Sequence, residues 1–351
     1  MIGPRDDLRL HAGYHSAQVE VPVRLNTNEA PVPPPPELVE RLALLPDRIE
    51  WHRYPDRRYR ALRGAVADLH GVRPDQVFVA NGSNEVLQTL CLAYGGAGRS
   101  MATFEPTYAL HGHIGRVTGT TVVSGERAAD LSLDLAEVHR VLEAERPHLT
   151  CLCSPNNPTG LVDRREAVVE VLGAVPGLLV VDEAYGQFAP WSALELAGDD
   201  VPLVVTRTFS KTWSMAGLRL GYLVGPAPLV AQLDEVVLPY HLDAFQQAAG
   251  LLSLEHGDAM DRRVAALVEE RGRLAARLSD LAVDVWPSDA NFVLFRPRGR
   301  SGHDVWQALV DRGVLVRDCS SWPRLADCLR VTVGTQHEDD AFLAALEEVL
   351  A

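Results

Sequence analysis

The chain has 351 residues, of which 47% are hydrophobic and 23% are charged, so it has the composition of an ordinary globular protein and enough length for two domains. Its formal net charge of −14 argues against a nucleic-acid partner, because phosphate backbones are bound by basic surfaces. No apolar run has the roughly 18 residues of a membrane-spanning helix, and the opening MIGPRDDLRL is unlike a signal peptide.

The N-terminal part of the chain is predicted to be an extended arm, because its first 30 residues are polar and a run of four prolines follows at 33–36. A helix is expected from Glu37, and an amphipathic helix at 59–70 ends before Gly71. Buried strands then alternate with helical patterns, which indicates a mostly parallel central sheet flanked by helices. The strand-like segments are 76–80, 149–153, 177–185 and 202–211.

The pattern changes after about residue 235. A long amphipathic helix is predicted at 259–281, and short strands with one more helix follow it. We therefore predict an α/β protein with three parts: an N-terminal arm over 1–30, a large domain over 31–235 and a small α+β domain over 236–351.

Lys211 is the only lysine of the chain, whose other 32 basic residues are all arginines. Arginine cannot lose its proton and attack a carbonyl, because its pKa lies above about 12, whereas a desolvated lysine can. The lone lysine indicates a covalent role, and a leftover surface lysine is the alternative.

Polar side chains gather where the predicted strands end, which is the edge at which parallel sheets bind ligands. Taken singly, each side chain could be a helix cap, a turn residue or part of a surface ion pair. Taken together they match pyridoxal 5′-phosphate, which needs a lysine, an acid for its ring nitrogen, polar groups for its phenolic oxygen and an anion site. The candidates are Gly82, Ser83, Asn84, Asn157, Asp182, Tyr185, Ser210, Lys211 and Arg219.

Three segments around these residues resemble the class I and II aminotransferases of pyridoxal-phosphate fold type I, namely SPNNPTG, VVDEAY and TFSKTWSMAGLRLGY. The segments RLNTNEAP, RYPD, NGSNE, EPTY, NFVLFR, GVLVRD and CLRVTVGT narrow the resemblance to the histidinol-phosphate aminotransferase branch, over residues 10 to 340. This resemblance implies transfer of the amino group of L-histidinol phosphate to 2-oxoglutarate in histidine biosynthesis. The products would be imidazole acetol phosphate and glutamate.

The resemblance also implies roles for residues of the cofactor site. Lys211 would hold the cofactor covalently and move the α-proton, and Asp182 would pair with the ring nitrogen. Asn157 and Tyr185 would bind the 3′ oxygen, and Tyr108 would stack on the ring. The phosphate would lie between Arg219, Ser210 and the backbone at Gly82, Ser83 and Asn84.

On the substrate side, the resemblance implies that Arg330 grips an anionic group. Arg317, Tyr14 and Asn157 match further substrate contacts. Tyr54 would reach the phosphate in the neighbouring subunit, which implies a homodimer with shared active sites.

Other functions remain open at this stage. An aromatic amino-acid aminotransferase or a phosphothreonine decarboxylase would share the cofactor residues, and the sequence does not identify an imidazole pocket. A cofactor-sensing regulator is disfavoured, because it would need a basic DNA-binding module and neither the length nor the charge of the chain leaves room for one. A cofactor-free Schiff-base aldolase is disfavoured as well, because it would not need Asp182, Tyr185 and the phosphate site.

A metal site is not expected, because the HGH segment at 111–113 offers two histidines without a third ligand, so we interpret them as solvated or core residues. The five cysteines are odd in number and lie mostly in apolar runs, which is typical of free thiols in a cytoplasmic protein.

Overall fold

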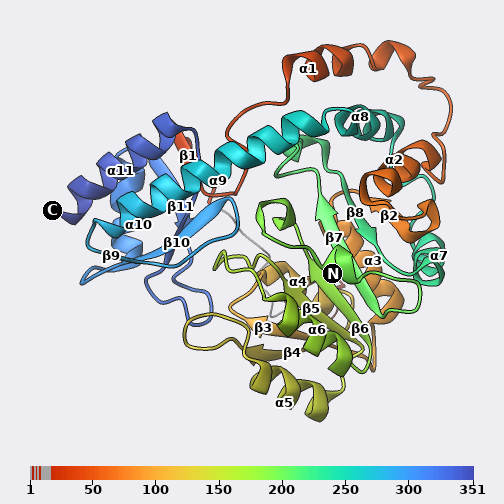
Figure 1. Cartoon of the computed structure of the whole chain (residues 1–351), viewed down its shortest axis with the longest axis horizontal. Coiled ribbons are helices and arrows are strands. Elements are labelled where there is room, and N and C mark those ends of the chain that lie inside the picture. Colours follow the sequence, from red (N-terminus) through yellow and green to blue (C-terminus); the bar gives the residue numbers. More distant parts are fainter. Residues whose placement is uncertain (1, 4, 6–7, 9–16) are drawn as a thin grey trace.

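The structure is a computed structural model that describes residues 2–3, 5, 8 and 17–351, and its strands form two separate sheets (Figure 1). The helices are α1 (Pro36–Ala43), α2 (Arg60–His70), α3 (Ser83–Tyr94), α4 (Ala109–Val117), α5 (Leu135–Glu145), α6 (Arg165–Ala174), α7 (Ala227–Val236), α8 (Ala244–Leu254), α9 (Gly257–Ser279), α10 (Gly302–Asp311) and α11 (Gln336–Leu350). The strands are β1 (Val23–Leu25), β2 (Val77–Ala80), β3 (Ser100–Glu105), β4 (Thr121–Glu126), β5 (Leu149–Cys153), β6 (Leu178–Asp182), β7 (Leu203–Thr208), β8 (Gly221–Val224), β9 (Val283–Val285), β10 (Phe292–Pro297), β11 (Val314–Asp318) and β12 (Leu329–Thr332).

The larger sheet has seven strands in the order β2-β8-β7-β6-β5-β3-β4, and only β8 runs antiparallel to its neighbours. Its central strand β6 is buried along its whole length, because helices cover both faces. Val180 packs in the core that includes α3 and α7, whereas Leu179 and Val181 pack on the opposite side with α5 and α6. The prediction of a mostly parallel sheet flanked by helices is confirmed.

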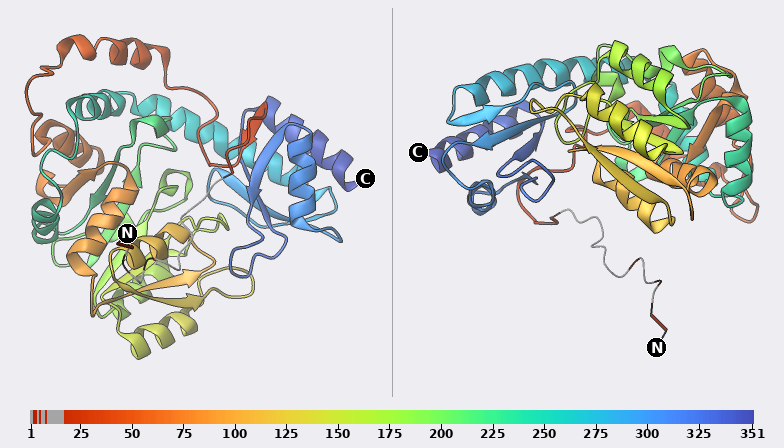
Figure 2. Two further views of the ribbon diagram at one scale, coloured as in Figure 1. Left: turned by 180° about the vertical axis from the view of Figure 1, so that it is seen from behind. Right: turned by 90° about the horizontal axis from the view of Figure 1, so that it is seen from below.

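The smaller sheet has five strands in the order β1-β11-β12-β10-β9. Strand β1 comes from the predicted N-terminal arm and pairs in parallel with β11, while the other pairs are antiparallel. Figure 2 shows this red strand beside the blue C-terminal strands. The pairing matters for the site, because it fixes the position of the residues that directly follow β1.

The long helix α9 joins the two units. Met260 near its start packs in the core that contains α2, whereas Leu274 and Leu278 pack in the core of the smaller sheet. Helix α8 lies against α1 and α2. The domain boundary at 235–236 stays a prediction, since α8 and the start of α9 pack with the first unit. In the described part of the chain, no helix is both long and apolar enough to cross a membrane.

Candidate active site

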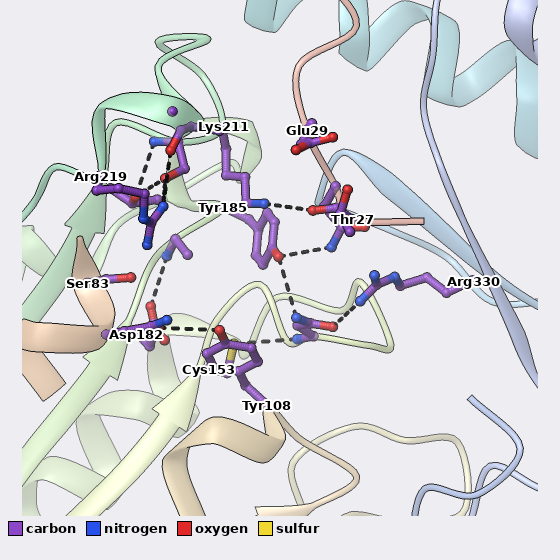
Figure 3. A pocket seen from close by; sticks show the side chains of 18 residues that line it. Thr27, Glu29, Ser83, Tyr108, Cys153, Asp182, Tyr185, Lys211, Arg219 and Arg330 are labelled. Carbon is purple, nitrogen blue, oxygen red and sulfur yellow. Dashed lines mark hydrogen bonds between the residues drawn. The ribbon is translucent and has the colours of Figure 1, made fainter. Parts of the chain in front are cut away.

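A cavity of about 380 Å³ lies at the carboxyl ends of β5, β6 and β7, where the N-terminal segment and β12 of the smaller sheet close over them (Figure 3). Most of the side chains singled out in the sequence line it. They are Ser83, Asn84, Tyr108, Asn157, Asp182, Tyr185, Ser210, Lys211, Arg219 and Arg330. Residues that are separated by almost the whole sequence therefore share one site.

Lys211 extends into this cavity just after β7. Its Nζ atom donates a hydrogen bond to the carbonyl oxygen of Thr27, 2.9 Å away. Burial lowers the pKa of Lys211 to about 7, and the positive charge of Arg330 acts in the same direction. An amine with this pKa is about half uncharged at pH 7 and largely uncharged above pH 8, so it can attack a carbonyl or accept a proton.

Asp182 ends β6, and its carboxylate is held from three sides. Its Oδ2 atom lies 2.9 Å from Nε2 of His111, a fully buried residue of α4. Its Oδ1 atom accepts hydrogen bonds from the Thr206 hydroxyl and from the backbone N–H of Ala184, each at 3.1 Å. The carboxylate therefore has a fixed orientation at the bottom of the cavity, where a buried anion can pair with a cationic ring nitrogen.

Tyr185 and Asn157 meet at the centre of the site. The phenolic oxygen of Tyr185 accepts a hydrogen bond from Asn28 Nδ2 at 2.9 Å and another from Asn157 Nδ2 at 3.4 Å. Because two amides donate to this oxygen, the hydroxyl must direct its own proton elsewhere. Tyr108 stands at the start of α4, with its hydroxyl 3.3 Å from Asn84 Oδ1.

The corner of the cavity beside the start of α3 is suited to bind an anion. Helix α3 begins at Ser83, directly after Gly82, which has a φ of 80°. The first N–H groups of the helix lack partners within it, because no helical turn precedes them. Nη1 of Arg219 donates to the Ser210 hydroxyl at 3.3 Å. A Cβ atom on Gly82 would lie 2.8 Å from Arg219 Nη2, so glycine permits the close approach of the guanidinium.

Arg330 supplies the cation on the other side of the cavity. It is buried on β12, and its guanidinium lies 5.0 Å from the ring centroid of Phe292. Nη1 donates to Asn157 Oδ1 at 2.5 Å, and Nη2 donates to the Asn26 carbonyl at 2.8 Å. These contacts hold the guanidinium in one orientation toward the cavity.

Three of the predicted residues do not line the cavity of their own chain, and one is not described. Gly82 lies directly behind the anion corner. Arg317 is the β11 partner of Arg330, and its guanidinium lies 5.6 Å from the Trp322 ring centroid. Tyr54 is 80% exposed and stacks on Tyr240 at 4.5 Å between centroids. Tyr14 falls outside the described residues. The roles assigned to the residues of the site, those of Arg317, Tyr54 and Tyr14 included, stay predictions.

Sequence reasoning missed several residues of the site. His111 was interpreted as a solvated or core histidine; it is buried, but it also bonds Asp182. Asn28 and Glu29 line the cavity from the predicted arm, where only the motif RLNTNEAP drew attention to them. In the described part of the chain, no three His, Cys, Asp or Glu side chains are grouped as metal ligands.

Comparison with known proteins identifies the family. The family model described as aminotransferase class I and II matches residues 20–346. The chain is 44% identical to the histidinol-phosphate aminotransferase of Frankia casuarinae, over 99% of this chain and 90% of that protein. It is also 44% identical to the enzyme of the same name from Streptomyces avermitilis, over 98% of this chain and 96% of that protein.

A solved structure supports the same assignment. The crystal structure of histidinol-phosphate aminotransferase from Sinorhizobium meliloti, in complex with pyridoxal-5′-phosphate, superposes with a TM-score of 0.86 at 26% identity. The superposition covers 94% of this chain and 91% of that one. Sequence and fold therefore agree over nearly the whole length, and the chain belongs to the class I and II aminotransferases.

Proposed function

We propose that the chain binds pyridoxal 5′-phosphate through Lys211 and transfers the amino group of L-histidinol phosphate to 2-oxoglutarate. The observation that carries the proposal is the Lys211 amine, which faces a cavity with the carboxylate of Asp182 at its base and the guanidinium of Arg219 at its rim. The names of the relatives at 44% identity support the choice of substrate.

The residues of the cavity fit this cofactor. The first turn of α3, Ser210 and Arg219 form a corner suited to a phosphate group, and the space there depends on Gly82 having no side chain. Asp182 would keep the ring nitrogen protonated, and Tyr185 with Asn157 would bind the 3′ oxygen. Tyr108 would stack on the ring. When bound, pyridoxal phosphate supplies an electrophilic carbonyl and a ring that withdraws electrons from the substrate's Cα.

Side chains of this protein would move the proton, bind the substrate and orient the acid at the base of the cavity. Lys211 Nζ would take the proton from Cα of the amino donor and hold it for the return transfer. Arg330 would hold the anionic end of either substrate, which is a phosphate in histidinol phosphate and a carboxylate in glutamate. His111 contacts Asp182 and the edge of the Tyr108 ring and does not line the cavity, so it acts as a positioning residue.

Two measurements test the proposal. Borohydride reduction of the protein with pyridoxal phosphate should attach the pyridoxyl group to Lys211 alone, because the chain has no other lysine. Lys211→Arg should take up no label and should not turn over. A panel of amino donors with 2-oxoglutarate should then rank histidinol phosphate above phenylalanine, tyrosine and histidine. Equal use of phenylalanine would favour an aromatic amino-acid aminotransferase instead.

We also propose a homodimer in the cytoplasm. Tyr54 is exposed in the single chain and lies away from its own cavity, which fits a residue that completes the site of a second copy. The five cysteines are free and buried, as expected in a reducing compartment. Mixing Tyr54→Ala chains with Lys211→Ala chains should restore activity, because each heterodimer would hold one intact site. No recovery despite proven heterodimers would contradict the shared site.

A further inference from the structure

Four consecutive residues, Asn26–Glu29, lie on the side of the cavity proposed for the substrate, and the last three of them line the cavity. The first three each bond a functional side chain. Asn26 accepts a hydrogen bond from Arg330, Thr27 accepts one from Lys211, and Asn28 donates one to Tyr185. Glu29 is the fourth, and Figure 3 shows it beside Thr27 near the end of the Lys211 side chain.

This segment is firmly anchored to the smaller sheet. Strand β1, just before it, pairs with β11, and the Asn28 backbone N–H donates to the Thr332 hydroxyl at 2.9 Å. The Thr332 hydroxyl in turn donates to Asn28 Oδ1 at 3.1 Å. Asn28 has a φ of 55°, a left-handed conformation that asparagine tolerates better than most residues. The backbone that carries Glu29 is therefore fixed at the mouth of the cavity.

Glu29 differs from the other carboxylate of the cavity. Asp182 is buried, and both of its oxygens have partners. Glu29 is exposed, and among the described residues its carboxylate has neither a hydrogen bond nor an ion pair. It nevertheless acts on the site, because its negative charge opposes the lowering of the Lys211 pKa. A ligand in the cavity therefore meets, in Glu29, a carboxylate without a hydrogen-bond partner among the described residues.

Such a carboxylate would repel the anionic substrates unless one of them places a hydrogen-bond donor against it. Both substrates of the proposed reaction have an anionic group for Arg330. Only the amino donor also has a ring with N–H groups, which a carboxylate binds well. Phenylalanine has no such group on its ring.

We propose that Glu29 determines specificity: its carboxylate accepts a hydrogen bond from the imidazole N–H of the amino donor and selects it over a phenyl ring. This inference rests on the proposed function and adds to it the residue that binds the ring of the amino donor. Glutamate, whose side chain ends in a carboxylate, would be disfavoured by Glu29 rather than bound by it.

The test compares two amino donors that differ only in the ring, L-histidinol phosphate and L-phenylalaninol phosphate. Single-turnover experiments would give kcat/KM of the half-reaction with the amino donor for the wild type, for Glu29→Gln and for Glu143→Gln. The last variant is a control that removes an exposed carboxylate of α5. Losing a charged acceptor should cost Glu29→Gln about tenfold with histidinol phosphate. The loss with phenylalaninol phosphate should be much smaller, and KM for glutamate should fall.

The outcomes separate this inference from the proposed function. Equal losses for both donors in Glu29→Gln would overturn the role of Glu29 and leave the reaction itself intact. Failure of the wild type to use histidinol phosphate would instead refute the proposed function. Pyridoxyl labelling of Lys211 in each variant shows that the cofactor site is still folded, and Glu29→Asp should recover only part of the lost discrimination.

Discussion

The two sides of the cavity are built in different ways. On the side proposed for the cofactor, Asp182 ends β6, whereas Ser210 and Arg219 lie between β7 and β8. The hydrogen bonds of these three side chains stay within the larger unit. On the side proposed for the substrate, Arg330 comes from the smaller sheet and is held by Asn26 and by Asn157 of the larger unit. The cofactor side is therefore set by one core, whereas the substrate side depends on how two units and the N-terminal segment meet.

The electrostatics of Lys211 depend on both sides at once, so its pH dependence gives the largest expected effect. Because the pKa of Lys211 is lowered to about 7, capture of pyridoxal phosphate by the apoenzyme should level off above pH 7. Two units below that pKa only about 1% of the amine is uncharged, so capture at pH 5 should be about a hundredfold slower. Borohydride trapping at timed intervals measures this rate. A rate that continues to rise toward pH 10 would show an ordinary lysine.

Asp182→Asn tests the cofactor side alone. The amide cannot keep a ring nitrogen protonated as a carboxylate does, so the rate of each half-reaction should fall by about 10² or more. Thr206→Val removes one partner of the same carboxylate and keeps its charge, so its loss should be far smaller. Near wild-type half-reactions in Asp182→Asn would remove this residue from the proposed role.

The difference between the two sides explains how far sequence alone could go. Lys211, Asp182 and Asn157 follow buried strands, and the rule that parallel strands end at one edge brings them together without a structure. Strand β1 has only three residues, and its partner β11 lies near the other end of the chain, so no local pattern reveals the pairing. Asn28 and Glu29 depend on that pairing for their place in the cavity.

His111 illustrates a second limit of the sequence. It lies in a short helix among apolar and small residues, where a buried histidine looks like a core residue. Its importance comes from the contact with Asp182, and that contact depends on the packing of α4 against the ends of the strands. The antiparallel direction of β8 was likewise not apparent, because its short apolar run fits either direction.

Arg330→Ala tests the substrate side. Charge-assisted hydrogen bonds contribute about 1.5–3 kcal/mol, so kcat/KM should fall about ten- to a hundredfold in both half-reactions. Labelling of Lys211 by the cofactor should persist, because Arg330 lies on the other side of the cavity from the Arg219 corner. A loss of labelling comparable to the loss of activity would mean that the two sides are not separable.

His111→Phe should have a smaller effect than Asp182→Asn, about tenfold, because the carboxylate keeps its charge and loses one partner. In an Asp182→Asn background the same change should add little, since His111 acts through that carboxylate. His113→Phe, two residues along the same helix, is the matched control. Fully additive losses would argue that His111 supports the fold rather than Asp182.

Arg317→Ala should give the smallest loss of activity among these variants. Arg317 and Arg330 are register partners on neighbouring strands, yet only Arg330 lines the cavity. Because Arg317 does not line the cavity, its removal should lower kcat/KM for histidinol phosphate by about a few-fold, and by less than Arg330→Ala. The cause is a weakened attraction for the phosphate, so added salt should narrow the gap between wild type and variant. A loss as large as that of Arg330→Ala would mean that Arg317 contacts the substrate directly in the working enzyme.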